Sequence, residues 1–193
     1  MTKFSAVNLT LAGAICMSFV GLLIRLIESA DGFQILFYRS IGMSLVILTL
    51  VCLRRNKSPF RVLKSLDRND FFMGICFSLA FLTYVFSMLN TSIASTLFLL
   101  SMSPIFAGCI GWFWINEKPH KVVWISMLIA LIGVSIMIKD GLTDSKSLGN
   151  ILAIFSAIFF ALGLVQARKS KKTDVLGGTF LGALFSCFLG LLI

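Results

Sequence analysis

Long apolar blocks separated by short charged clusters dominate this sequence of 193 residues. Each block has roughly 17–24 residues, which is enough to cross about 30 Å of hydrocarbon as an α-helix. Because backbone polar groups in lipid must be satisfied within the protein, a chain of such blocks folds as a helical bundle. We expect an all-α integral membrane protein with about seven transmembrane helices. The expected spans are Phe4–Ile27, Phe33–Leu53, Phe71–Leu89, Ile93–Ile115, Val122–Ile138, Leu148–Val165 and Val175–Ile193.

Composition excludes several other classes of protein. With 58% hydrophobic and 13% charged residues, the chain has too few polar side chains to cover a soluble domain. The net charge of +9 comes from linkers between the spans, so we expect a lipid bilayer and no nucleic acid as partner. The five cysteines lie within apolar blocks, and His120 has no second ligand nearby in sequence. We therefore expect no metal site and no cofactor.

The basic residues predict how the chain is oriented in the membrane. If the N-terminus is cytoplasmic, thirteen of the seventeen lysines and arginines fall on the cytoplasmic side. This asymmetry follows the positive-inside rule. Together with the short loops, it predicts a multi-pass protein of a bacterial plasma (inner) membrane. The thirteen residues are Lys3, Arg54, Arg55, Lys57, Arg61, Lys64, Arg68, Lys118, Lys121, Arg168, Lys169, Lys171 and Lys172.

A weak internal repeat relates the first span to the sixth. Asn8 and Gly21 align with Asn150 and Gly163 at an offset of 142 residues. Five spans separate the two repeat starts, so the second copy crosses the membrane in the opposite direction. Inverted repeats of this kind are typical of secondary transporters, whose substrates bind between the repeats. We expect one complete five-helix repeat in residues 1–140 and two helices of an inverted second repeat in residues 141–193.

Several short motifs occur in the order and spacing of a known transporter family. They are Phe37-Tyr38-Arg39 in the second span, Leu89-Asn90-Thr91-Ser92-Ile93-Ala94-Ser95 between the third and fourth, Pro104 within the fourth, Asn116-Glu117-Lys118-Pro119 after it and Gly133-Val134 in the fifth. Through them the chain resembles an EamA-type member of the drug/metabolite transporter superfamily, although Ser126 stands where a glycine is often found. The resemblance implies ten helices in two inverted halves that exchange or export small organic metabolites by alternating access.

Arg39 is the most informative candidate for substrate binding. It lies within the second expected span, where an arginine costs about 2.5–3.5 kcal/mol at the helix centre. One interpretation is a cation that faces a central cavity and binds a carboxylate. The other is a snorkelling side chain, or one that pairs with Glu28 or Asp31.

Other polar residues are candidates for the wall of the same cavity. Tyr84, Ser87 and Asn90 recur every three residues, and Pro104 removes a hydrogen bond to the carbonyl of Leu100 and should bend its helix. Hydroxyl groups also join helices without binding a ligand, and a kink also serves packing alone. The expected substrate-binding residues are Arg39, Tyr38, Tyr84, Ser87, Asn90, Ser101, Ser103 and Pro104.

The sequence favours transport over catalysis. It has no nucleophile with partners, no phosphate-binding glycine loop and no metal cluster, so we expect no enzyme. We expect a secondary transporter, for export or uptake, of a small organic metabolite such as an amino acid. The alternative is a truncated, non-transporting membrane protein or an interaction partner that needs an oligomer, such as a homodimer. Three further apolar spans encoded after codon 193 would favour the transporter.

Overall fold

Helices make up the regular structure of the part of the chain that the computed structural model describes. The described residues are 7, 8, 11, 13, 15, 19–21, 23, 24, 26, 27, 31–55, 66–116, 121–138, 147–170 and 175–191. The contacts divide the chain into two units, Met1–Asp31 and Gly32–Ile193. In the first unit, nearly all described residues are helical. The second unit contains α2 (Gly32–Arg55), α4 (Arg68–Asn90), α5 (Ile93–Leu100), α6 (Ser103–Ile115), α7 (Lys121–Ile138), α8 (Ser147–Lys169) and α9 (Leu176–Leu191).

These helices confirm the predicted all-α class. Each expected span after the first coincides with a helix, or with the pair α5 and α6, to within a few residues. Four segments of the described chain are long and apolar enough to cross a membrane, namely Gly32–Cys52, Arg68–Asn90, Ile93–Ile115 and Ser147–Lys169. The apolar helix α9 is shorter. Seven spans, the division at residue 140 and the cytoplasmic N-terminus stay predictions. Glu28, Glu117 and His120 lie outside the described residues.

Local polar groups fix where α4 begins and ends. At its start the backbone N–H of Asp67 donates to Asp70 Oδ2 at 3.0 Å, as in a capping box. At its end the N–H of Thr91 donates to the carbonyl of Ser87 at 2.9 Å. Ser92 then caps α5, because its hydroxyl accepts the N–H of Ser95 at 3.1 Å. The predicted break between the third and fourth spans is confirmed.

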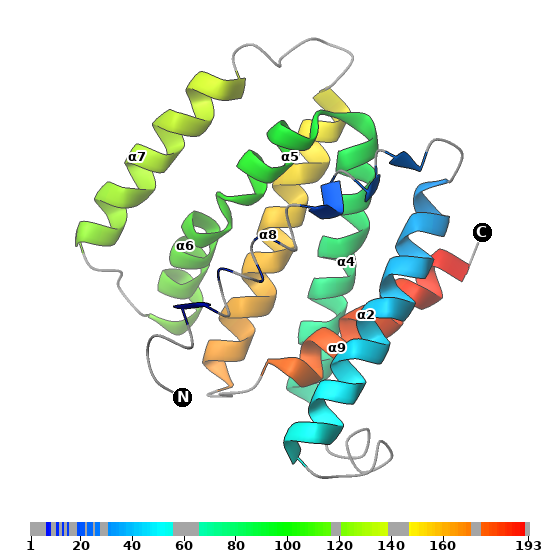
Figure 1. Cartoon of the computed structure of the whole chain (residues 1–193). Helices are drawn as coiled ribbons and strands as arrows, with labels where there is room; N and C mark the ends of the chain where they lie inside the picture. Colours follow the sequence, from blue (N-terminus) through cyan, green and yellow to red (C-terminus); the bar gives the residue numbers. More distant parts are fainter. Residues whose placement is uncertain are drawn as a thin grey trace. The chain divides into compact units, whose positions relative to one another are not determined.

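Helix α4 lies between α8 and α9 (Figure 1). It is antiparallel to α8 and parallel to α9, and α2 is antiparallel to α9. Helices α5 and α6 pack on α8 and run parallel to it. The pairs that define these directions are Phe77 with Gly163, Thr91 with Asn150, Met73 with Gly178, Ser78 with Ser186, Phe37 with Gly190, Ile47 with Phe180, Leu99 with Ala153 and Ala107 with Ala161. The second spans of the two expected repeats, α2 and α9, thus run in opposite directions, as an inverted repeat requires; the repeat itself stays a prediction.

Small residues allow α8 and α9 to approach α4 closely. Gly149, Ala153, Ala157 and Ala161 recur every fourth residue on α8, and all four are buried. A Cβ added at Gly182 of α9 would lie 2.7 Å from the Cβ of Phe77. Small residues at such spacing are the usual means of close helix packing in membranes. The close packing of α4 therefore depends on small residues, glycine and alanine, on α8 and α9.

A serine hydroxyl also joins α8 to α4, and its removal gives a modest predicted effect. Ser156 Oγ donates to the carbonyl of Ala80 at 2.9 Å, and Ser156 is 1% exposed. Because interhelical hydrogen bonds in membranes average about 0.6 kcal/mol, we expect Ser156→Ala to lower the free energy of unfolding by about that amount. Denaturation in detergent, followed by tryptophan fluorescence, measures it. Ser126→Ala is the control, since exposed Ser126 bonds only its own helix, at Val122. Equal effects of the two substitutions would contradict this role of Ser156.

Candidate functional site

Arg39 on α2 reaches the aromatic face of α4. Its Cζ atom lies 5.3 Å from the ring centroid of Phe81 and 5.0 Å from that of Tyr84, which are cation–π distances. Its Nη1 atom is buried and finds no hydrogen-bond partner in the described structure. Buried polar groups normally have such partners, and an unmet one is costly. The guanidinium is therefore held in place by ring faces while one of its donors remains available.

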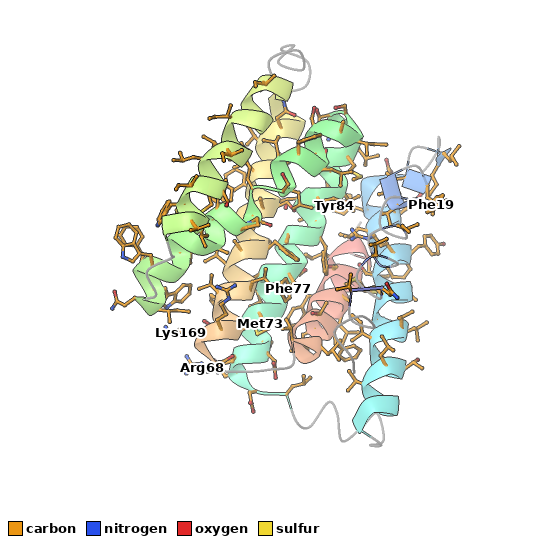
Figure 2. All side chains as sticks on the ribbon, turned by 60° about the vertical axis from the view of Figure 1, so that its left-hand side comes forward. Phe19, Arg68, Met73, Phe77, Tyr84 and Lys169 are labelled. Atoms are coloured by element: carbon orange, nitrogen blue, oxygen red, sulfur yellow. The ribbon has the colours of Figure 1, made fainter. Side chains whose placement is uncertain are left out.

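Arg39 and Tyr84 lie at similar distances from one end of the helix pair. The start of α2 meets the end of α4, because a Cβ added at Gly32 would lie 2.9 Å from Leu89 Cδ1. Arg39 is seven residues after Gly32, or about 10 Å along the helix axis. Figure 2 shows Tyr84, Phe77 and Met73 following one another along α4. The arginine thus lies well below the end of the bundle, beside a mostly apolar stretch of α4.

Two other predicted residues of α4 make different contacts. Ser87 is fully buried, and its Oγ lies 2.9 Å from Thr96 Oγ1 of α5 in a hydrogen bond. Asn90 is exposed at the end of the helix, where its Nδ2 donates to the carbonyl of Phe86 at 2.7 Å. The structure therefore places Tyr84 and Ser87 in the interior and Asn90 at the surface.

The predicted bend at Pro104 is a complete break of the helix. Helix α5 ends at Leu100, and Ser101 and Met102 form a turn before α6 begins at Ser103. Pro104 occupies the first turn of α6, where a missing N–H costs little. Ser101 is exposed and donates to the carbonyl of Phe98 at 2.6 Å, while Ser103 is half-buried and Pro104 exposed. These three residues lie on a different element from the contacts of Arg39.

Tyr38 projects away from the protein. It is 74% exposed, and its ring contacts Phe37 at a centroid distance of 5.5 Å. Of the predicted set, Tyr84 is thus the residue that packs against Arg39.

Asn150 and Phe81 were not among the predicted residues. Asn150 on α8 is 6% exposed; its Oδ1 accepts from Thr91 Oγ1 at 2.9 Å, while its Nδ2 has no hydrogen-bond partner in the described structure. The sequence does point to Asn150, because placing an amide side chain within an apolar span costs free energy unless the amide has a hydrogen-bond partner. Nothing in the sequence distinguishes Phe81 from the other phenylalanines, of which the chain has nineteen in all.

The groove between α4 and α9 has a different character. It has a volume of about 220 Å³ and is lined by Ile75, Ser78, Leu79, Phe185, Phe188 and Leu189. Its single polar side chain, Ser78, is already hydrogen-bonded to Ser186 at 3.2 Å. Among the described residues, no three His, Cys, Asp or Glu side chains are grouped to hold a metal ion. Arg39 is not among the residues that line this groove.

Comparison with known proteins now places the chain in a family. Residues 4–139 match the EamA-like transporter family. Two relatives are named uncharacterized transporters: one from Helicobacter pylori strain J99 is 27% identical over 179 residues, and one from strain 26695 is 24% identical over 178. Each alignment covers 89% of this chain and 57% of the relative, so the chain spans little more than half the length of these proteins. No solved structure matches the chain at a significant level. Because the family match covers more than half of the 193 residues, the chain belongs to the EamA-like transporter family.

Proposed function

We propose that the protein is a secondary transporter of small organic metabolites with an anionic group, such as amino acids or related acids. It would work by alternating access in a bacterial plasma membrane with its N-terminus in the cytoplasm. The observation that carries this proposal is the buried Nη1 of Arg39, which has no acceptor in the described structure and lies beside Phe81 and Tyr84. In this arrangement Arg39 binds the carboxylate of the substrate.

The surroundings of Arg39 favour ligand binding over snorkelling. A snorkelling arginine extends toward the headgroups, whereas this guanidinium lies against two rings about 10 Å along the helix from its start. The rings supply a partly compensating cation–π attraction, but Nη1 bonds to no acceptor in the described structure, the hydroxyl of Tyr84 included. A carboxylate supplies two acceptor oxygens in the geometry that a guanidinium prefers. Arg39 therefore offers a positive charge and a hydrogen-bond donor that its aromatic neighbours leave without an acceptor in the described structure. A carboxylate ligand would supply that acceptor.

Most of the other predicted residues stay in the proposal as cavity wall. The turn at Ser101 and Met102 interrupts the helical hydrogen bonds between α5 and α6, and broken helices in transporters commonly line substrate sites. Ser87, Ser103 and Pro104 complete this proposed set, whereas Tyr38 projects away from the protein and Asn90 is exposed at the end of α4, so these two leave it.

Transport by the full-length protein tests the proposal. Membrane vesicles with and without the protein are loaded with labelled amino acids and small carboxylic acids, and release is followed over time. We expect faster release of at least one anionic or zwitterionic compound from the vesicles that contain the protein. Identical release of every compound from both kinds of vesicle would refute transport of this substrate class.

The ring of Tyr84 gives a second test of the same site. Because cation–π contacts contribute about 0.5–2 kcal/mol, we expect Tyr84→Leu to raise the half-saturating substrate concentration by roughly 2–30-fold. Phe72→Leu is the matched control: Phe72 lies on the same helix, is 40% exposed and contacts Trp114 instead of Arg39. Concentration-dependent transport in vesicles measures both variants. If both raised the half-saturating concentration equally, loss of ring packing on α4 would explain the result and the role of Tyr84 would be wrong.

A further inference from the structure

We infer that Asn150 of α8 is a second substrate-binding residue, and that the transported molecule is an extended organic acid with a hydrogen-bond acceptor at each end. This inference rests on the proposed function, because it assigns one end of that molecule to Arg39. It adds a residue from the second expected repeat to a proposed site that otherwise draws on α2, α4 and the turn between α5 and α6.

The hydrogen bonding of Asn150 leaves a donor for a ligand. The side chain is 94% buried, since its exposed fraction is 6%. Thr91 Oγ1 donates to Asn150 Oδ1 at 2.9 Å and thereby fixes the orientation of the amide. The Nδ2 group, with two hydrogens to donate, has no hydrogen-bond partner in the described structure. A group that bonds to it must offer an acceptor, such as a carboxylate, carbonyl or hydroxyl oxygen.

Arg39 and Asn150 approach one face of α4. Arg39 packs on Tyr84, and Asn150 bonds to Thr91, seven residues later. Seven residues make almost two helical turns, so Tyr84 and Thr91 lie on the same side of α4 and about 10 Å apart along its axis. Ser87 lies between them in sequence, and its hydroxyl is already engaged by Thr96. In the described structure, the buried side-chain donors that have no hydrogen-bond partner are Arg39 Nη1 and Asn150 Nδ2.

This spacing indicates the class of ligand. The two residues of α4 that Arg39 and Asn150 contact are about 10 Å apart along its axis, so two acceptors, each about 3 Å from its donor, reach both donors when a short carbon chain separates the acceptors. A molecule with a single carboxylate would satisfy Arg39 and leave the amide of Asn150 without a partner. Dicarboxylates of five or six carbons, and amino acids with a carboxylate or amide side chain, carry both groups.

The test uses two pairs of probes that differ at one end: glutarate with pentanoate, and adipate with hexanoate. Each probe competes with transport of a labelled substrate by the full-length protein in vesicles. The variants are Asn150→Ala and a control, Asn69→Ala, because Asn69 is an exposed amide at the opposite end of the α4–α8 pair that bonds Gln166 at 3.2 Å. Thr91→Val keeps the volume of Thr91 and removes the hydroxyl that orients Asn150.

For the unmodified protein we expect a dicarboxylate to compete about tenfold better than the matched monocarboxylate, as one added hydrogen bond allows. Asn150→Ala should abolish this preference without weakening the monocarboxylate, Thr91→Val should reduce it, and Asn69→Ala should preserve it. The inference is wrong if the protein shows no preference, or if Asn150→Ala keeps it or weakens both members of a pair equally. Such results leave the proposed function standing as long as a labelled substrate is transported; absence of all transport contradicts the proposed function itself.

Discussion

Replacing Arg39 by glutamine is expected to raise the half-saturating concentration for an anionic substrate by roughly 10–100-fold. The substitution keeps a polar side chain but removes the charge, and hydrogen bonds to charged groups contribute about 1.5–3 kcal/mol. It also removes the cation that lies 5.0 Å from the ring of Tyr84. Transport of the labelled substrate over a range of concentrations, by vesicles with equal amounts of protein, measures the effect.

Arg39→Lys separates charge from geometry. Lysine keeps the positive charge but lacks the planar fork that binds both oxygens of a carboxylate, so we expect an intermediate loss. Arg68→Gln is the matched control, because Arg68 is exposed at the start of α4. The assignment of Arg39 would be contradicted if Arg39→Gln transported the substrate with unchanged affinity, or if Arg68→Gln reduced affinity to the same extent.

Gly149→Ala is expected to cause the largest loss of stability among the glycine substitutions. A Cβ at Gly149 would lie 2.7 Å from the backbone carbonyl carbon of Asn90 and 2.7 Å from the backbone N of Thr91. Neither atom belongs to a flexible side chain, so the start of α8 must move away from the end of α4. Overpacking of this kind costs about 1–3 kcal/mol. The hydrogen bond between Thr91 and Asn150 lies next to the clash and should be weakened as well.

Gly42→Ala supplies the comparison. A Cβ at Gly42 on α2 meets nothing within 4 Å, so alanine should stabilise α2 by up to about 1 kcal/mol through its higher helix propensity. Thermal unfolding of the purified full-length protein in detergent measures both variants. We expect Gly149→Ala to unfold at a lower temperature than the unmodified protein and Gly42→Ala at the same or a higher one. If Gly149→Ala were as stable as Gly42→Ala, the close contact between α8 and α4 would be wrong.

Much of the secondary structure was predictable because apolar run length is a strong signal in membrane proteins. The break after Asn90 and a bend near Pro104 were also predictable, since Ser92 is a good N-cap and proline disrupts a helix interior, but the full break between α5 and α6 was not predicted. Helix pairing was not readable. The recurrence of small residues every fourth position marks a close-packing face of α8, but its partner, such as Thr91 at Gly149, depends on how the helices dock.

The candidate site was only partly predictable for geometric reasons. Arg39 stood out because a charge inside an apolar span is expensive. Tyr38 is its neighbour in sequence, but consecutive helical residues point about 100° apart, so Tyr38 projects outward while Arg39 packs on α4. A spacing of three residues similarly drifts around a helix, which carries Asn90 away from the face of Tyr84. In the sequence Asn150 stands out only as a repeat position, because the lack of a partner for its Nδ2 in the described structure depends on how α8 packs on α4.

Counterflow in proteoliposomes tests the central claim, alternating-access transport of an organic anion, most directly. Liposomes that contain the full-length protein are loaded with an unlabelled substrate found in the release assay, and entry of the same labelled compound is measured. We predict that the internal substrate accelerates labelled entry and causes transient accumulation above equilibrium, and that Arg39→Gln greatly weakens both effects. Labelled entry that is the same with and without internal substrate, or the same in protein-free liposomes, would contradict the account.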